Sequence, residues 1–344
     1  MSEALFRGTA LIEEDLEERP VEIRVENGIV TAVDETGTPG DTWICPAFFN
    51  AHTHLGDTIA MDIAAEGDLA ALVTPPHGVK HRLLASARRE DLVAAMRASI
   101  HEMIASGTAG FADFREGGKD GVRALREAVD GLPCVPVIFG REGGEYIAEG
   151  FGVSSCRDIP GLEEQVSAAR CAGKQIAFHA GERDPDDVNA ALAFDPDLLI
   201  HCTHATRRQL RECADREIPI VVCPRSNWRL RVTRSPGHPP IRAMLDLGIR
   251  LLLGTDNVMF IQPDMFREMA FTAAVYDVSP RELLAGAIAG SALFNQPFFI
   301  EEQMPANFIV IDTARANIRY SRDLCNSLVN RASPEKIVKK VFNS

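Results

Sequence analysis

Several features that would place the chain in a membrane or outside the cell are missing from the sequence. No apolar run approaches the roughly 20 residues that a membrane-spanning helix needs. The first residues, MSEALFRGTA, contain no basic segment followed by an apolar stretch, so they do not resemble a signal peptide. We therefore expect a cytoplasmic protein without a membrane partner.

Cysteine pairs and an excess of basic residues are also missing. The eight cysteines form no CxxC pair, and several lie inside apolar runs such as PIVVCP. This placement predicts buried thiols in a reducing compartment and argues against a disulfide framework or a thiolate metal site. The net charge of −13 argues against nucleic acid as a partner. We expect a small-molecule substrate, and a homo-oligomer is compatible with these features.

Short apolar runs alternate with amphipathic stretches from about Trp43 onward. The eight strand candidates are WICPAFFNAH, GTAGFADF, CVPVIFG, GFGVSS, QIAFHAG, LLIHCTH, IPIVVCP and IRLLLGTD, of which GFGVSS is the weakest. Helical patterns such as REDLVAAMRASIHEMIAS lie between them. Eight strands that alternate with helices predict an α/β fold, a closed (β/α)8 TIM-type barrel. An open doubly wound sheet is the alternative, but no Gly-rich phosphate loop follows the first strand.

Strand-like segments also occur at both ends of the chain. VEIRVENGIVTAVDE alternates apolar and polar residues around Asn27-Gly28, which is a strong hairpin signal. ANFIVIDT and EKIVKKVFNS near the C-terminus resemble strands as well. We predict that residues 1–45 and 299–344 form one discontinuous small β-sandwich domain, and that residues 46–298 form the barrel.

Metal-binding side chains gather where the predicted barrel strands end. His52 and His54 lie two residues apart at the end of the first strand, so both imidazoles point the same way and can reach one metal ion. Later strands end in similar polar residues: His179, His201 and Asp256, with Glu182 three residues beyond His179. Alone, each fits a core histidine, a turn or a solvated acid. Because barrels of this type carry their active sites at the C-terminal ends of the strands, the joint pattern predicts a metal site.

These motifs resemble those of the metal-dependent amidohydrolase superfamily, and most closely its cytosine deaminase and chlorohydrolase-like branch. The resemblance rests on HTH in the first strand, HAGE in the fifth, HCTH in the sixth, PRSN after the seventh and GTDN in the eighth. It covers the whole chain. The motif set is specific for the superfamily and not for a substrate.

The resemblance implies a role for each matching residue. His52, His54, His179 and Asp256 would bind one divalent metal, Zn²⁺ or Fe²⁺, which would activate water to hydroxide. Asp256 would also accept the water proton. Glu182 would deliver a proton to a ring nitrogen of the substrate, and His201 would orient the hydroxide or polarise the substrate.

One absent residue bears on the number of metals. Binuclear relatives bridge two metals with a carboxylated lysine at the end of strand four, but no lysine occurs here between Lys119 and Lys174. Some relatives use a glutamate after strand three instead, and Glu142 lies close to that place. We predict a site with one metal. Glu142 is the residue that could still bind a second one.

The activity implied by the resemblance is hydrolysis of a carbon–nitrogen bond other than a peptide bond. Deamination of an aminated heterocycle, such as a purine or pyrimidine, is the first hypothesis. Hydrolysis of a cyclic amide, or removal of chloride, at the same metal site is the alternative. A catalytically inactive binding protein is the third, and the retention of every ligand and of Glu182 argues against it.

Basic residues mark the predicted substrate end of the barrel. The segment PRSNWRLRVTRSPGHPPIR after strand seven carries five arginines and no acidic residue. This segment can be a solvent-exposed loop without a binding role. Alternatively, its arginines bind an anionic or electron-rich group of the substrate. His77 and Lys80 lie on the long loop after strand one. The predicted substrate contacts are Arg225, Asn227, Arg115, Arg141 and His81.

Overall fold

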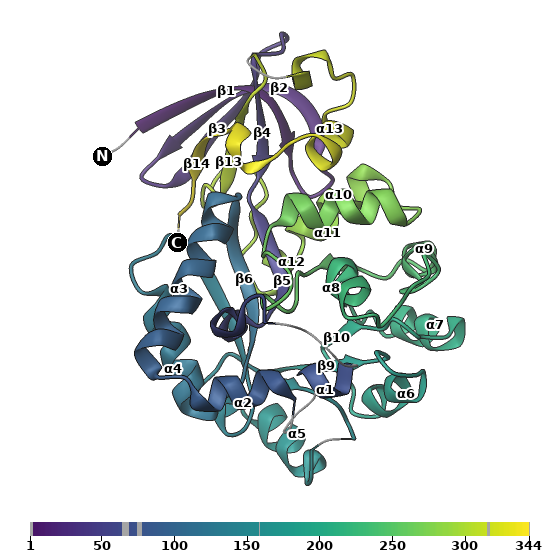
Figure 1. Ribbon diagram of the computed structural model, residues 1–344. Helices are drawn as coiled ribbons and strands as arrows, with labels where there is room; N and C mark the ends of the chain where they lie inside the picture. The colour runs from purple at the N-terminus through teal and green to yellow at the C-terminus, as the bar shows by residue number, and fades with distance from the viewer. Residues whose placement is uncertain (1–2, 64–68, 74–77, 158, 315–316, 344) are drawn as a thin grey trace.

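The computed structural model describes residues 3–63, 69–73, 78–157, 159–314 and 317–343, and it contains two β-sheets (Figure 1). The larger sheet consists of β5 (Phe48–Thr53), β6 (Thr108–Arg115), β7 (Val135–Gly140), β8 (Gly150–Val153), β9 (Gln175–Ala180), β10 (Leu198–His201), β11 (Ile220–Val222) and β12 (Leu251–Leu253). Neighbouring strands follow the order of the sequence and pair in parallel. A parallel bridge between Thr53 and Asp256 joins the two ends of the sheet. The predicted (β/α)8 barrel is confirmed, including its weakest strand, β8.

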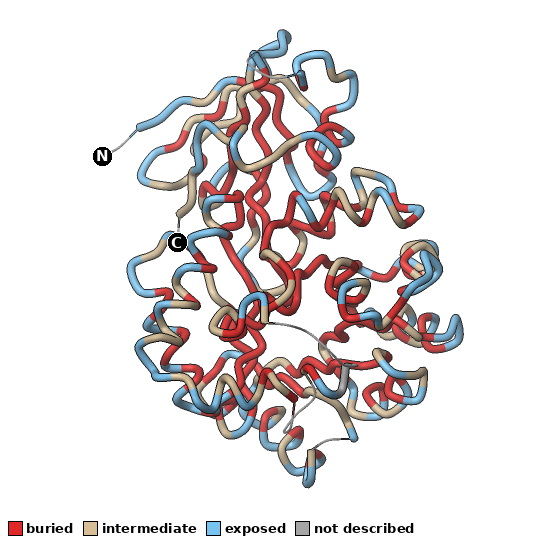
Figure 2. Tube along the Cα trace, viewed as in Figure 1, coloured by how far each residue is buried: buried red, intermediate tan, exposed pale blue. Residues whose placement is uncertain are grey.

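Helices surround this sheet and cover its outer face. They are α1 (Leu69–Val73), α2 (Val79–Ser86), α3 (Arg89–Ala105), α4 (Gly118–Val129), α5 (Leu162–Cys171), α6 (Asp186–Leu192), α7 (Arg207–Asp215), α8 (Pro224–Arg229), α9 (Ile241–Asp246), α10 (Met265–Val275), α11 (Pro280–Ile288) and α12 (Gly290–Leu293). Every residue of β5 and β6 is buried, because helices cover one face and the barrel interior the other (Figure 2).

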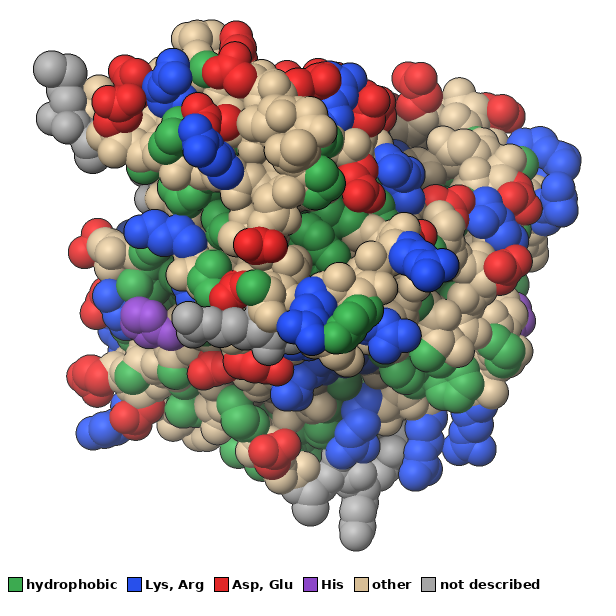
Figure 3. Space-filling model, turned by 90° about the horizontal axis from the view of Figure 1, so that it is seen from above, with side chains coloured by type: hydrophobic (Ala, Val, Ile, Leu, Met, Phe, Trp, Pro, Cys, Tyr) green, Lys and Arg blue, Asp and Glu red, His purple; other side chains and the backbone are tan. Residues whose placement is uncertain are grey.

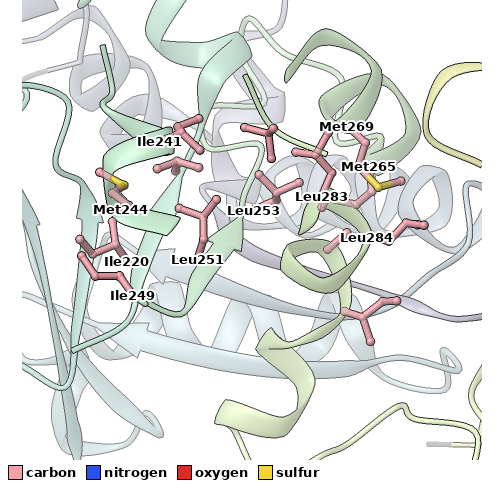
Figure 4. Packing of buried hydrophobic residues seen from close by; sticks show 14 of the residues in the cluster. Ile220, Ile241, Met244, Ile249, Leu251, Leu253, Met265, Met269, Leu283 and Leu284 are labelled. Atoms are coloured by element: carbon pink, nitrogen blue, oxygen red, sulfur yellow. The ribbon is translucent and has the colours of Figure 1, made fainter. Parts of the chain in front are cut away.

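The packing of the outer layer is clearest around β12. Leu253 packs with Met265 of α10 and with Leu283 and Leu284 of α11 in one apolar cluster (Figure 4). These side chains are almost completely removed from solvent. The cluster fixes the last barrel strand, which leads directly into Asp256.

The smaller sheet is built from both ends of the chain. Its order is β14-β13-β4-β1-β2-β3, and its strands are β1 (Glu3–Ile12), β2 (Glu17–Glu26), β3 (Ile29–Glu35), β4 (Thr42–Pro46), β13 (Phe308–Asp312) and β14 (Ile337–Val341), with α13 (Leu324–Asn330) beside it. Asn27 and Gly28 both have positive φ in the predicted hairpin between β2 and β3. The apolar run at residues 43–49 is divided, because β4 pairs in this sheet and β5 in the barrel.

The surface and the cysteines agree with most of what the composition predicts. Acidic side chains are interspersed among basic ones on the face shown in Figure 3. All eight cysteines are free and six are buried, but Cys156 is half-buried and Cys171 is exposed at the end of α5. Among the described residues, no helix has both the length and the apolar character needed to cross a bilayer.

Candidate metal centre

The four candidate ligands come together at the C-terminal end of the barrel. His52 belongs to β5, His54 directly follows this strand, His179 belongs to β9, and Asp256 follows β12. The ligand nitrogens of the three histidines lie within 4.8 Å of one another, and ligand atoms of His52, His201 and Asp256 form a second such group. Oδ1 of Asp256 lies 3.3 Å from Nε2 of His52 and 3.6 Å from Nε2 of His54. The two groups share His52, so they form a single cluster.

Hydrogen bonds fix the orientation of two of these imidazoles. Nδ1 of His54 lies 2.9 Å from the carbonyl oxygen of Phe114, and Nδ1 of His179 lies 2.9 Å from that of Val153. A ring nitrogen that faces a carbonyl carries the hydrogen, so Nε2 keeps its lone pair. This is the arrangement that metal-binding histidines usually show.

His52 has no hydrogen-bond partner on either ring nitrogen, although it is fully buried. Burial lowers the pKa of His52 to about 4 and that of His54 to about 3. Both imidazoles are therefore neutral at physiological pH, which is the form that binds a metal. A neutral, buried and unpartnered imidazole beside a carboxylate fits a divalent metal such as zinc or iron.

The backbone at the strand ends is shaped to hold this cluster. Asp256 has φ of 62° and His201 has φ of 74°, in the left-handed region that side chains other than glycine rarely adopt. Such strain is typical of functional sites. A Cβ atom on Gly254 would lie 2.6 Å from Cβ of His52, so only glycine lets the last strand approach the first this closely.

Glu182 and His201 face each other at the cavity that the candidate ligands line. Oε1 of Glu182 lies 3.6 Å from Nε2 of His201. Burial raises the pKa of Glu182, which favours the protonated carboxyl. The two residues predicted to move and orient protons thus lie beside the metal-binding cluster.

A network of buried charges behind His54 was not predicted from the sequence. Oε1 of Glu116 lies 2.9 Å from Nδ1 of His54 and 2.9 Å from Nζ of Lys80. Lys80 also lies 2.9 Å from Oδ2 of Asp57. All four side chains are buried. Glu116 thereby acts as a second partner for the ring nitrogen of His54. The only signal in the sequence was a carboxylate just after the second barrel strand, in FADFRE.

The structure brings two of the five predicted substrate contacts to the cavity. Arg141 and His81 line it together with Lys80, Arg183 and Asn257, which the sequence had not assigned. The imidazole of His81 is also held by the carbonyl oxygen of Val73, 3.0 Å away. His77, on the same loop, lies outside the described residues.

The other three predicted contacts point elsewhere. The guanidinium of Arg115 is buried in ion pairs with Asp113 at 3.3 Å and Glu116 at 2.6 Å. Arg225 donates to the carbonyl oxygens of Gln262 at 3.2 Å and Asp264 at 3.3 Å. Asn227 donates to the hydroxyl of Thr203 at 2.9 Å. All three follow a strand as predicted, but Arg115 turns to neighbouring carboxylates, and Arg225 and Asn227 turn to partners remote in sequence.

Glu142, the candidate ligand for a second metal, does not lie in the cluster. Glu142 is exposed, and its Oε2 accepts from the backbone N–H of Gly117 at 3.0 Å. Lys174 donates to the carbonyl oxygen of Ala148. Within the described part of the chain, the two convergent groups contain only histidines and Asp256. This composition fits one divalent metal.

Two protein families match parts of the chain: the amidohydrolase family over residues 43–146 and the adenosine deaminase family over residues 157–293. A protein of Methanothermobacter thermautotrophicus, provisionally named an aminohydrolase, is 34% identical over 96% of this chain and 95% of its own length. An adenosine deaminase from Xanthomonas campestris with bound zinc has a TM-score of 0.81 at 16% identity, covering 97% of this chain and 90% of that one. An atrazine chlorohydrolase from Arthrobacter aurescens, complexed with zinc, has a TM-score of 0.76 at 18% identity, covering 98% and 95%.

The two solved structures share the fold of this chain, and the archaeal relative shares its sequence over nearly the whole length. The buried histidines and Asp256 supply the donors for one divalent metal. The chain therefore belongs to the metal-dependent amidohydrolase superfamily.

Proposed function

We propose that the protein is a metal-dependent hydrolase that removes the amino group of a purine- or pyrimidine-like heterocycle. The observation that carries this proposal is that Glu182 and His201 share one cavity with His54, His179 and Asp256, three of the candidate ligands. The match to the adenosine deaminase family covers the part of the chain that contains Glu182, His201 and Asp256. The archaeal relative's name also refers to release of an amino group.

His52, His54, His179 and Asp256 would hold the metal. The bound metal supplies Lewis acidity, which lowers the pKa of water at the site from about 16 towards 7. Asp256 has one oxygen turned to the histidines, so it is placed to accept the proton that this water gives up. His201 lies across the cavity, where its imidazole can orient the attacking oxygen or polarise the substrate.

Glu182 would donate a proton, whereas Asp256 would accept one. Burial raises the pKa of the Glu182 carboxyl, which favours the acid form that can pass a proton to a ring nitrogen of the substrate. Protonation of the ring relieves the negative charge that would otherwise build up as the oxygen attacks the carbon bearing the amino group. The proton that Asp256 has accepted would then pass to the amino group, and ammonia leaves as the carbon–nitrogen bond breaks.

Ammonia release tests the proposal directly. Metal-replete protein is incubated with a panel of aminated purines, pyrimidines and pteridines, and with chlorinated triazines and cyclic amides as the alternative substrates. Ammonia from at least one aminated ring, abolished in Glu182→Gln, is the expected result. Chloride release or ring opening without ammonia would assign the site to the alternative chemistry.

Three further assignments belong to the same proposal. The protein is cytoplasmic and acts on a small molecule. The catalytic unit is the barrel of residues 46–298, and the small domain comprises residues 1–45 and 299–344. Substrate contacts include Arg141 and His81, both of which line the cavity.

A further inference from the structure

Arg141 lines the cavity of the candidate metal centre as a buried cation that has no side-chain partner among the described residues. It directly follows β7, its side chain lines the cavity, and the residue is only 5% exposed. Its Nε and Nη2 atoms are buried and have no hydrogen-bond partner. Across the described residues, no carboxylate forms an ion pair with it.

The other buried cations nearby already form ion pairs with carboxylates. Lys80 is held by Asp57 and Glu116, each 2.9 Å from its ammonium. Arg115 contacts the second oxygen of Glu116 at 2.6 Å. Glu116 is therefore already shared among two cations and His54, and it does not compensate the charge of Arg141.

The backbone holds Arg141 in place before any ligand arrives. A Cβ atom on Gly140 would lie 2.4 Å from the carbonyl carbon of Gly144, so the chain turns sharply just ahead of the arginine. The carbonyl oxygen of Arg141 accepts from the N–H of Gly144 at 2.9 Å. A fixed backbone reduces the entropy that the side chain must lose on binding.

Arg141 lines the same cavity as His54, His179 and Asp256, three of the candidate metal ligands. A ligand held by Arg141 would therefore extend towards the reacting centre.

We propose that the substrate carries an anionic oxygen group, a carboxylate or a phosphate, and that Arg141 binds it. The inference rests on the proposed function, because it concerns the substrate of the same site. A buried guanidinium without a counter-charge is costly, and a carboxylate or phosphate supplies both the charge and two acceptors that match its planar fork. A neutral carbonyl would satisfy the N–H groups but leave the charge uncompensated.

Matched substrate pairs test this inference. Ammonia release is measured for aminated heterocycles with and without a ring carboxylate, and for an aminated nucleoside and its 5′-phosphate. For wild type we expect kcat/KM at least about tenfold higher for the anionic member of one pair, because a charge-assisted hydrogen bond contributes enough for that ratio. The substrate pair in which the anionic member reacts faster shows whether Arg141 binds a carboxylate or a phosphate.

Two variants then assign the preference to Arg141. Arg141→Gln should abolish the ratio, and Arg141→Lys should restore part of it, since it keeps the charge but loses the fork. Arg234→Gln is the control, because it removes the same charge from the exposed segment after α8. Metal content and far-UV circular dichroism of each variant verify that the site and fold persist. Equal kcat/KM within every wild-type pair, or a ratio that survives Arg141→Gln, would overturn the inference.

A binding measurement separates failure of this inference from failure of the proposed function. If no aminated ring yields ammonia, the proposed function is wrong. Calorimetry with a heteroaromatic carboxylate that lacks the amino group, and with its neutral amide, then tests Arg141 alone. Tighter binding of the carboxylate by wild type, lost in Arg141→Gln but not in Arg234→Gln, supports the inference, and equal affinities contradict it.

Discussion

Ser226 donates its hydroxyl hydrogen to Oδ2 of Asp256 over 2.6 Å, while Oδ1 of the same carboxylate faces His52. The two oxygens of Asp256 are thereby given different environments. Ser226 comes from α8 and is completely buried. It fixes which oxygen is free for the metal and for the water proton, so the serine of PRSN is a positioning residue for Asp256.

Ser226→Ala should remove the hydrogen bond that orients the Asp256 carboxylate, and so lower both the affinity for the metal and kcat. Partners that orient metal ligands typically contribute about 10- to 100-fold in affinity or activity. We expect a loss of that size in kcat, together with a higher metal dissociation constant measured by competition with a chelator. Ser291→Ala is a matched control, because Ser291 is also fully buried but bonds to the carbonyl oxygen of Ile288. Unchanged metal affinity in Ser226→Ala would show that Asp256 needs no such support.

Metal content should be about one equivalent of zinc or iron per chain. Elemental analysis of the purified protein measures it, and His52→Ala or Asp256→Ala should empty the site and abolish turnover. His101→Ala is the control, since His101 lies exposed on α3. Two equivalents at full activity would contradict the mononuclear assignment.

Glu182→Gln should keep the metal and the fold but lose most of kcat. Proton transfer by a positioned side chain is typically worth about 10²- to 10⁴-fold in rate, and an amide cannot perform it. Steady-state ammonia release measures the loss. Glu142→Gln makes the same change at an exposed residue of the loop after β7 and should have little effect. Activity of Glu182→Gln within a few-fold of wild type would remove the proton-transfer role.

Replacement of Arg225 should affect stability first. Its guanidinium lies 3.4 Å from Glu268, which is completely buried. Removing one partner of a buried ion pair typically costs about 3–5 kcal/mol, because the other charge is left uncompensated. Arg225→Met should therefore lower the free energy of unfolding in urea by an amount of this order, and the double variant Arg225→Met/Glu268→Leu should regain much of it. A single variant as stable as wild type would contradict this structural role.

Glu268 should also make stability depend on pH. Burial raises the pKa of its carboxyl from 4.5 to about 7. Between these two values the folded state holds a proton that the unfolded state has released, so stability falls as pH rises from about 4.5 to about 7. In Glu268→Gln residue 268 cannot ionise, so the stability difference from wild type should shift in favour of the variant across this window by an amount on the order of 3 kcal/mol. Urea unfolding at pH 5, 6, 7 and 8 measures the difference, and parallel pH profiles would contradict it.

The parts of the structure that follow a local rule were predictable from the sequence. Alternation of apolar runs and helical patterns predicted the barrel, and the rule that sites lie at strand ends predicted where His52, His179 and Asp256 would fall. Contacts between remote segments were not predictable in this way. Arg225 turns to Gln262 and Asp264, and Lys80 reaches Glu116 from α2, because packing in three dimensions decides both.

The bridge between Thr53 and Asp256 joins the first barrel strand to the last, and each of these strands carries part of the metal-binding cluster. A ribosome makes His52 and His54 long before it makes Asp256. The growing chain thus cannot capture a metal ion through the whole cluster until the eighth strand has been synthesised and has closed against the first. We therefore expect the metal to bind late in synthesis of the chain. A chain truncated before Asp256 would not form the complete metal site.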